Sequence, residues 1–102
     1  MVLQRTIKNI VSSVGVGLHS GQKVALTLNP APEGHGVVFE RLDIKNNARI
    51  KVNALAVKET KLCSTIGNEN FSIATVEHLM SALSATGIDN ILIQLDGKEI
   101  PI

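Results

Sequence analysis

Residues 72 to 87 read S-I-A-T-V-E-H-L-M-S-A-L-S-A-T-G, and this stretch decides the fold. Its apolar residues recur at i, i+3, i+4 and i+7, at Val76, Leu79, Met80 and Leu83. This spacing predicts a helix with one apolar face, the kind of helix that packs on a sheet. We expect the helix to run from Val76 to Thr86, with Thr75 as its N-cap and Gly87 as the residue that ends it.

The opposite face of this helix is unusual because it carries no Lys or Arg and only small residues after the first turn. Its members are Glu77, His78, Ser81, Ala82, Ser84 and Ala85. A face in contact with water normally carries long charged side chains. The composition therefore predicts that a second layer, such as another helix, covers this face.

The rest of the chain predicts short strands separated by turns. The segments expected to be strands are 7–14, 23–28, 37–41, 50–52, 54–57, 62–66, 71–73 and 91–95. Residues 67–70 should form a hairpin turn, and the apolar segment 91–95 should lie in the sheet interior. Three glycines at 15, 17 and 21 predict unusual backbone angles or a close approach by another group.

These elements predict an α+β fold, a two-layer sandwich of a mostly antiparallel sheet with one helix (Val76 to Thr86) packed on it. Five strands would make a sheet about 20 Å wide, whereas one helix covers about 10 Å. We therefore expect a second helix that this chain lacks. The apolar end at Ile100-Pro101-Ile102 also predicts a truncated chain, because natural termini are usually polar.

Composition excludes several classes of function. The chain has 102 residues, 2 % aromatic residues and a net charge of +1, with no basic stripe, so we expect no binding to nucleic acid. Cys63 is the single cysteine and cannot form an internal disulfide. The chain opens without a secretory leader and contains no run of 18 apolar residues. These features predict a cytoplasmic protein without a transmembrane segment.

Glu77 and His78 are the residues most suited to chemistry. Neighbours on a helix point about 100° apart, but both can serve a site beyond the helix N-terminus. A catalytic zinc site commonly has three protein ligands, an open position and a nearby carboxylate base, so the pair could supply one ligand and the base. The alternative is a surface Glu beside a partly buried His. Zinc-protease motifs are absent, since the inverted motif would need His where Ala74 stands.

The other candidate ligands are His19, His35 and Cys63. His19 lies among glycines, which is compatible with a hydrogen-bonding role in an active site and equally with an ordinary loop position. His35 in its Pro/Gly loop is expected to be solvated, and Cys63 to be a small buried residue. These residues alone do not predict a complete zinc site.

Five motifs taken together resemble the N-terminal portion of the UDP-3-O-acyl-N-acetylglucosamine deacetylase family, zinc enzymes of lipid A biosynthesis in Gram-negative bacteria. They are G-V-G-L-H-S-G (15–21), E-T-K-L-C-S-T (59–65), T-V-E-H-L (75–79), G-I-D-N-I (87–91) and E-I-P-I (99–102). The resemblance implies that His78 is the first zinc ligand and that Glu77 is the general base that activates the attacking water. It implies a place near the active site for His19. It also implies that Leu62 and Cys63 belong to a small sheet insert bordering the passage for the substrate acyl chain.

The resemblance further implies two similar domains that pack helix layer against helix layer. Residues 1–102 would then be an incomplete N-terminal domain, and the catalytic partner domain, with the other zinc ligands, would be absent. The predicted function is a zinc-dependent deacetylase that hydrolyses the acetamide of UDP-3-O-acyl-N-acetylglucosamine, with these residues inactive by themselves. The rival hypothesis is a non-enzymatic α+β domain that docks a partner through its small-residue helix face.

Overall fold

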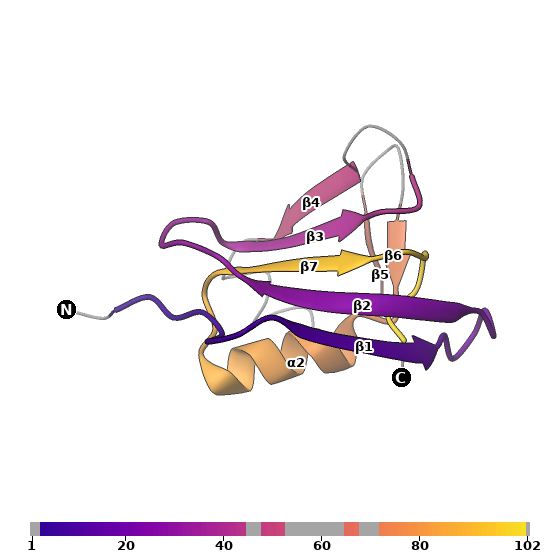
Figure 1. Ribbon diagram of the computed structural model, residues 1–102, viewed down its shortest axis with the longest axis horizontal. Helices are drawn as coiled ribbons and strands as arrows, with labels where there is room; N and C mark the ends of the chain where they lie inside the picture. Colours follow the sequence, from indigo (N-terminus) through magenta and orange to yellow (C-terminus); the bar gives the residue numbers. More distant parts are fainter. Residues whose placement is uncertain (1–2, 45–47, 53–64, 68–71, 102) are drawn as a thin grey trace.

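The computed structural model describes residues 3–44, 48–52, 65–67 and 72–101. Its elements, in chain order, are β1 (Val11–Val16), β2 (Lys23–Pro30), β3 (Val37–Arg41), β4 (Ala48–Val52), β5 (Thr65–Gly67), β6 (Ser72–Ala74), α2 (Glu77–Thr86) and β7 (Ile91–Leu95). The described residues thus combine strands with one helix (Figure 1), which confirms the predicted α+β class.

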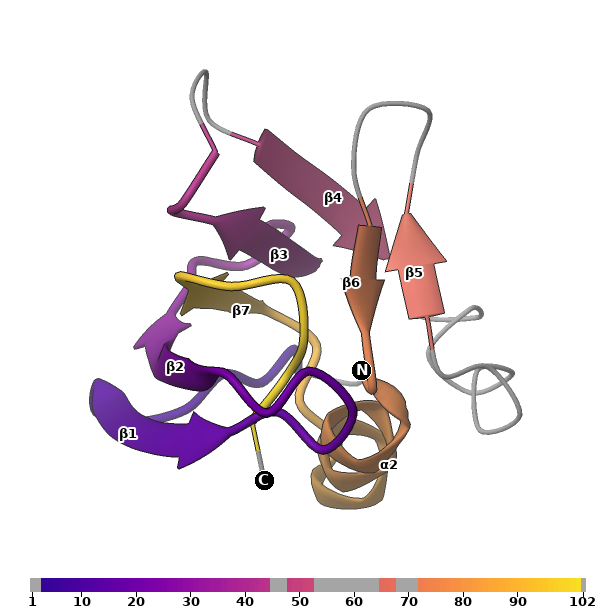
Figure 2. The same cartoon turned by 90° about the vertical axis from the view of Figure 1, so that its right-hand side faces the viewer.

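The main sheet has five strands in the order β1-β2-β7-β3-β4. Neighbouring strands are antiparallel except β3 and β7, which are parallel, so the sheet is mostly antiparallel as predicted. The predicted interior position of residues 91–95 is confirmed, because β7 lies between β2 and β3. β5 and β6 form a separate antiparallel pair. This pair and α2 lie on the same side of the main sheet (Figure 2).

The core forms between α2 and the face of the sheet turned toward it. On the central strands Phe39 lies opposite Ile93 in the pairing register, and both are fully buried. Met80 and Leu83 of α2 are buried in the same cluster. Complete burial of such side chains contributes roughly 1.5–3 kcal/mol each to the stability of the fold. Because Met80 and Leu83 belong to the apolar face predicted for α2, that face is the one that closes this core.

The other face of the sheet carries a row of hydrogen-bonded polar side chains. Asn29 Nδ2 donates to Gln94 Oε1 at 3.0 Å, and Gln94 Nε2 donates to Glu40 Oε1 at 2.8 Å. Arg49 Nε donates to Glu40 Oε2 at 2.9 Å. The hydrogen bond from Gln94 is the largest cause that lowers the pKa of Glu40, and Arg49 adds to it. Glu40 is therefore a buried carboxylate with paired oxygens, on the face away from α2.

The boundaries of several strands differ from those predicted. Residues 37–41 and 91–95 match, whereas β1 begins at Val11 rather than Ile7, because pairing with β2 starts at Val11 opposite Leu28. β4 begins at Ala48, two residues earlier than predicted.

The two strands of the predicted hairpin around residues 67–70 pair as β5 and β6. Residues 68–70 of its turn lie outside the described residues. The expected strand 54–57 lies outside the described residues, and so do residues 62–64 and 71. Ile100 at the apolar end of the chain is buried in the core, and its N–H donates to the carbonyl of Ala74 at 3.0 Å.

The predicted helix is confirmed, but its predicted N-cap is wrong. Val76 occupies the N-cap position without a side-chain capping hydrogen bond, and the Thr75 hydroxyl donates to Glu99 instead. A buried carboxylate has taken the hydroxyl that would otherwise cap the helix. Gly87 ends the helix as predicted, in the left-handed conformation with φ 69°. No helix in the described segments has the length and apolarity needed to cross a bilayer.

Candidate active site

Glu77 and His78 form the first turn of α2, directly after β6 and the two residues that join them. His78 is exposed, and Glu77 is half-buried. Among the described residues, Oε2 of Glu77 is a buried side-chain oxygen without a hydrogen-bond partner. A buried carboxylate oxygen without a donor is costly, and such atoms often mark a place where a ligand, water or ion binds.

Glu99 is a second carboxylate close to this turn, and it is almost completely buried, with 2 % of its surface exposed. The Thr75 hydroxyl donates to Oε2 at 2.6 Å, and the Ser20 N–H donates to Oε1 at 2.9 Å. The His19 N–H is shared between both oxygens at 3.1 and 3.2 Å. These hydrogen bonds, with that from Thr75 the largest cause, lower the pKa of Glu99 from 4.5 to about 2.

Thr75 has a strained backbone, with φ at 61°. A β-branched residue rarely adopts this left-handed conformation, which costs roughly 1–3 kcal/mol. Such strain persists only where surrounding contacts hold the residue. The hydrogen bond to Glu99 is one such contact, and Thr75 precedes Glu77 by two residues.

Gly17 lets the chain pass close to Glu99. A Cβ on Gly17 would overlap with Oε1 of Glu99 and with Oγ of Ser20. The loop from Gly17 to Gln22 is closed by a hydrogen bond from the Gly17 N–H to the Gln22 carbonyl at 2.9 Å. The predicted close approach at these glycines is therefore confirmed at Gly17, and Gly21 has the predicted unusual angle, with φ at 69°.

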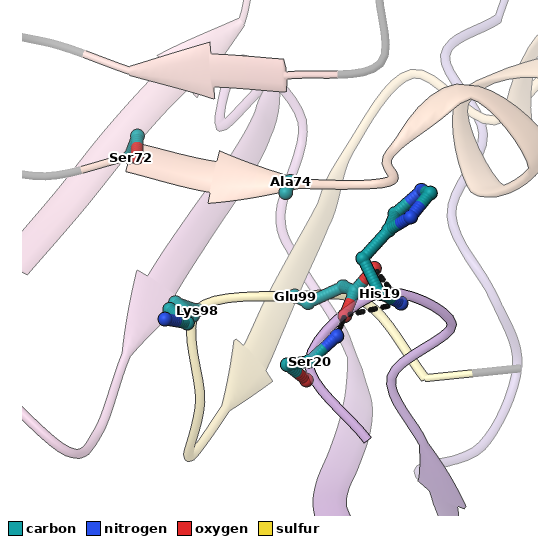
Figure 3. Close-up of a pocket in the computed structure, with 6 residues that line it drawn as sticks. All are labelled: His19, Ser20, Ser72, Ala74, Lys98 and Glu99. Atoms are coloured by element: carbon teal, nitrogen blue, oxygen red, sulfur yellow. Dashed lines mark hydrogen bonds between the residues drawn. The ribbon is translucent and has the colours of Figure 1, made fainter. Parts of the chain in front are cut away.

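A pocket of about 250 Å³ opens beside this cluster. It is lined by His19, Ser20, Ser72, Ala74, Lys98 and Glu99. Figure 3 shows the backbone of His19 and Ser20 bonded to Glu99, with the His19 ring rising from its loop on the side of the chain that leads from Ala74 to α2. The pocket thus lies where the loop, the end of β6 and the chain after β7 meet.

Of the predicted site residues, His19 is the one that lines this pocket. Glu77 and His78 do not line it, although Glu77 follows the pocket residue Ala74 by three positions. Leu62 and Cys63 lie outside the described residues, so their predicted substrate contacts stay predictions. Glu99 belongs to the E-I-P-I motif (99–102), but nothing in its sequence context predicts a role for its side chain in the site.

The fit of a zinc ion to these residues is partial. The described residues contain no group of three His, Cys, Asp or Glu side chains placed to hold a metal. His78 offers one exposed imidazole, and Glu77 offers one carboxylate oxygen without a partner. A catalytic zinc needs about three protein ligands, so this part of the chain can supply only a share of them.

Comparison with known proteins identifies relatives of the whole chain. The family model described as LpxC, UDP-3-O-acyl N-acetylglycosamine deacetylase, matches residues 4–102. The UDP-3-O-acyl-N-acetylglucosamine deacetylase of Acidithiobacillus ferrooxidans is 51 % identical over 102 residues, and that of Myxococcus xanthus is 52 % identical over 99. These matches include 100 % and 97 % of this chain but 34 % and 32 % of the two relatives. The chain therefore spans about a third of the length of the curated relatives that it matches.

Proposed function

This chain belongs to the UDP-3-O-acyl N-acetylglycosamine deacetylase family, and from this membership we propose that it forms the N-terminal part of a zinc-dependent amidase. The substrate would be UDP-3-O-acyl-N-acetylglucosamine, whose acetamide is hydrolysed in lipid A biosynthesis in the cytoplasm of a Gram-negative bacterium. The family membership supports the reaction class. The residue-level observation that supports it is the unpartnered Oε2 of Glu77 beside the exposed His78.

In this proposal His78 binds the metal and Glu77 acts as the general base. A zinc ion at this position supplies Lewis acidity, which polarises a carbonyl and lowers the pKa of water. Oε2 of Glu77 would accept the proton as water attacks the acetamide carbon, because it is a buried acceptor with no donor of its own among the described residues. The C–N bond then breaks to release acetate, and the leaving amine would take up a proton from a group of the parent protein outside residues 1–102. The helix N-terminus adds partial positive charge near this turn.

The remaining parts of the site would come from the rest of the parent protein. One imidazole is too few ligands for tight zinc binding, so residues 1–102 alone should be inactive and should bind zinc weakly. The exposed small residues of α2, which are Ser81, Ala82, Ser84 and Ala85, would then face the second domain. Leu62 and Cys63 would border the acyl chain.

The test uses the full-length parent protein with three variants. Glu77→Gln keeps the size of the side chain but removes the base, so kcat should fall about 10²- to 10⁴-fold with zinc content unchanged. His78→Ala should lower zinc content measured by elemental analysis, together with activity. Glu33→Gln, at an exposed position in a turn, is the matched control and should leave kcat unchanged.

Near-normal turnover of Glu77→Gln at saturating zinc would refute the base assignment. Unchanged metal content in His78→Ala would refute the ligand assignment. A parent protein that binds no zinc and hydrolyses no acetamide, but associates with another protein through α2, would support the rival hypothesis of a docking domain.

A further inference from the structure

We propose that Glu99 is a positioning residue whose carboxylate joins the His19 loop (residues 17–22) to the segment before α2, and so fixes His19 relative to Glu77 and His78. This inference rests on the proposed function, because it concerns the geometry of that site. It assigns a role to a buried charge that the proposed reaction does not itself use.

The first argument is that Glu99 bonds two segments that are distant in sequence. Its carboxylate accepts hydrogen bonds from His19 and Ser20, which precede it by 80 and 79 residues. It also accepts one from Thr75, which precedes it by 24 residues. One side chain therefore sets the separation between the loop and the start of the helix.

The second argument concerns the burial of the charge. Removing a carboxylate from water is costly unless hydrogen bonds replace the lost solvent. The donors that the structure gives Glu99 are neutral, two backbone N–H groups and one hydroxyl. These donors offset the cost of burying the charge, and through them the loop and the segment before α2 are held to the same two oxygen atoms.

The third argument is that the backbone of Glu99 is itself fixed to β6. The Ala74 N–H donates to the Lys98 carbonyl at 2.8 Å, and the Ile100 N–H donates to the Ala74 carbonyl at 3.0 Å. These bonds bracket Glu99 and align it with the residue before Thr75. The carboxylate is thus anchored on both sides while it holds the loop.

Two local features agree with a fixed geometry at this point. Thr75 keeps a strained left-handed backbone next to its hydrogen bond with Glu99. Gly17 has no room for a Cβ because Glu99 and Ser20 occupy that space. A strained residue and an obligatory glycine on either side of one carboxylate are expected where position is constrained by function.

The test measures kcat, KM, zinc content and amide exchange in the full-length parent protein. In Glu99→Gln the amide nitrogen faces N–H donors, so the loop should shift. We expect kcat to fall about 10- to 100-fold with KM within about threefold, because small displacements in a site cost rate more than binding. Zinc content should not change, and the amides of His19 and Ser20 should exchange faster with solvent.

The matched control is Glu40→Gln, which alters another buried, hydrogen-bonded carboxylate on the face of the sheet away from α2. It should lower thermal stability as Glu99→Gln does, but leave kcat within about twofold. Equal effects of the two variants on kcat would show that Glu99 is only structural and would overturn the inference.

A second pair of variants decides the matter if Glu99→Gln does not fold. Thr75→Val removes only the hydroxyl donor and should lower kcat, whereas Thr75→Ser keeps the hydroxyl and should retain it. Equal kcat values for this pair would overturn the inference. A wild-type parent without deacetylase activity would refute the proposed function and this inference with it, whereas an active wild type with unaffected Glu99 and Thr75 variants would refute the inference alone.

Discussion

At the scale of single residues, Glu99 is a carboxylate that the fold keeps charged in its interior. Neutral donors from Thr75, Ser20 and His19, with the Thr75 hydroxyl the largest cause, replace the water that the charge loses and lower its pKa to about 2. Glu40 achieves a similar result on the other face of the sheet with Gln94 and Arg49. Both carboxylates bind a proton more weakly in the folded chain than in the unfolded chain, where ordinary values apply.

This difference predicts how stability depends on pH. The pKa of Glu99 in the folded state lies below 4.5. The ionised carboxylate therefore contributes fully to the free energy of unfolding above about pH 4.5, and this contribution is lost as the pH falls toward 2. The urea concentration at the midpoint of unfolding should therefore decrease as the pH is lowered from about 5 to about 3. In the Glu99→Gln variant this decrease should be smaller. Identical pH profiles for the two proteins would contradict the lowered pKa.

Residue types alone predicted only part of this site. Glu77, His78 and His19 are chemically conspicuous as an adjacent Glu-His pair and a histidine among glycines, but their roles were assigned from the family resemblance and stay predictions. Glu99 is not conspicuous in this way, because its donors come from segments 80 and 24 residues away and two of them are backbone groups. Backbone donors have no signature in side-chain identity, so only the folded arrangement reveals them.

At the scale of elements, α2 has different determinants at its two ends. Its C-terminal end depends on Gly87, whose N–H bonds to the carbonyls of Leu83 and Ser84. Its N-terminal end has no side-chain cap, since Thr75 bonds to Glu99. The start of the helix is therefore set by tertiary contacts, and its end is set by local sequence.

A substitution at Gly87 measures how much the left-handed residue at the end of α2 contributes to the free energy of unfolding. No heavy atom lies within 4 Å of a Cβ added there, so Gly87→Ala would change only the backbone conformational energy. We expect the free energy of unfolding to fall by about 1–2 kcal/mol, as measured by urea denaturation. Gly87→Asn is the control and should cost less, because Asn tolerates the left-handed conformation. Equal stability of the alanine variant and wild type would contradict this account.

The predicted elements were accurate where the apolar pattern was clear. The helix was found from its 3.6-residue spacing, and the strands at 37–41 and 91–95 matched because short apolar runs between turns are typical of buried strands. The N-cap prediction was wrong because the Thr75 hydroxyl donates to Glu99 instead of capping the helix. The sequence around Thr75 does not indicate that this competing acceptor lies nearby. The parallel pairing of β3 with β7 was not predicted, since strand order depends on how distant segments meet.

At the scale of the whole molecule, the chain leaves apolar surface exposed. β1 is an edge strand of the described sheet, and Val14 and Val16 on it are 59 % and 52 % exposed. Leu18 after it is 61 % exposed. Edge strands with exposed apolar side chains tend to associate with other chains.

Residues 1–102 expressed alone should therefore self-associate, with an average mass that rises with concentration in light scattering. Val14→Lys places a charge on the edge strand and should shift the chain toward the monomer. Ser84→Lys, on the exposed face of α2, is the control for added charge and should shift it less if the edge strand is the contact. A monomeric wild-type chain that melts cooperatively would contradict this prediction.

The central position of β7 has a consequence for the order in which the protein forms during synthesis. β2 and β3 do not touch each other in the sheet; each pairs with β7, which is translated only after residues 42–90. At ordinary translation rates this delay lasts roughly 2–10 s. During that time the two hairpins β1-β2 and β3-β4 have no common sheet, and the apolar sides of β2 and β3 are accessible to chaperones. The five-stranded sheet can therefore close only after β7 has been translated.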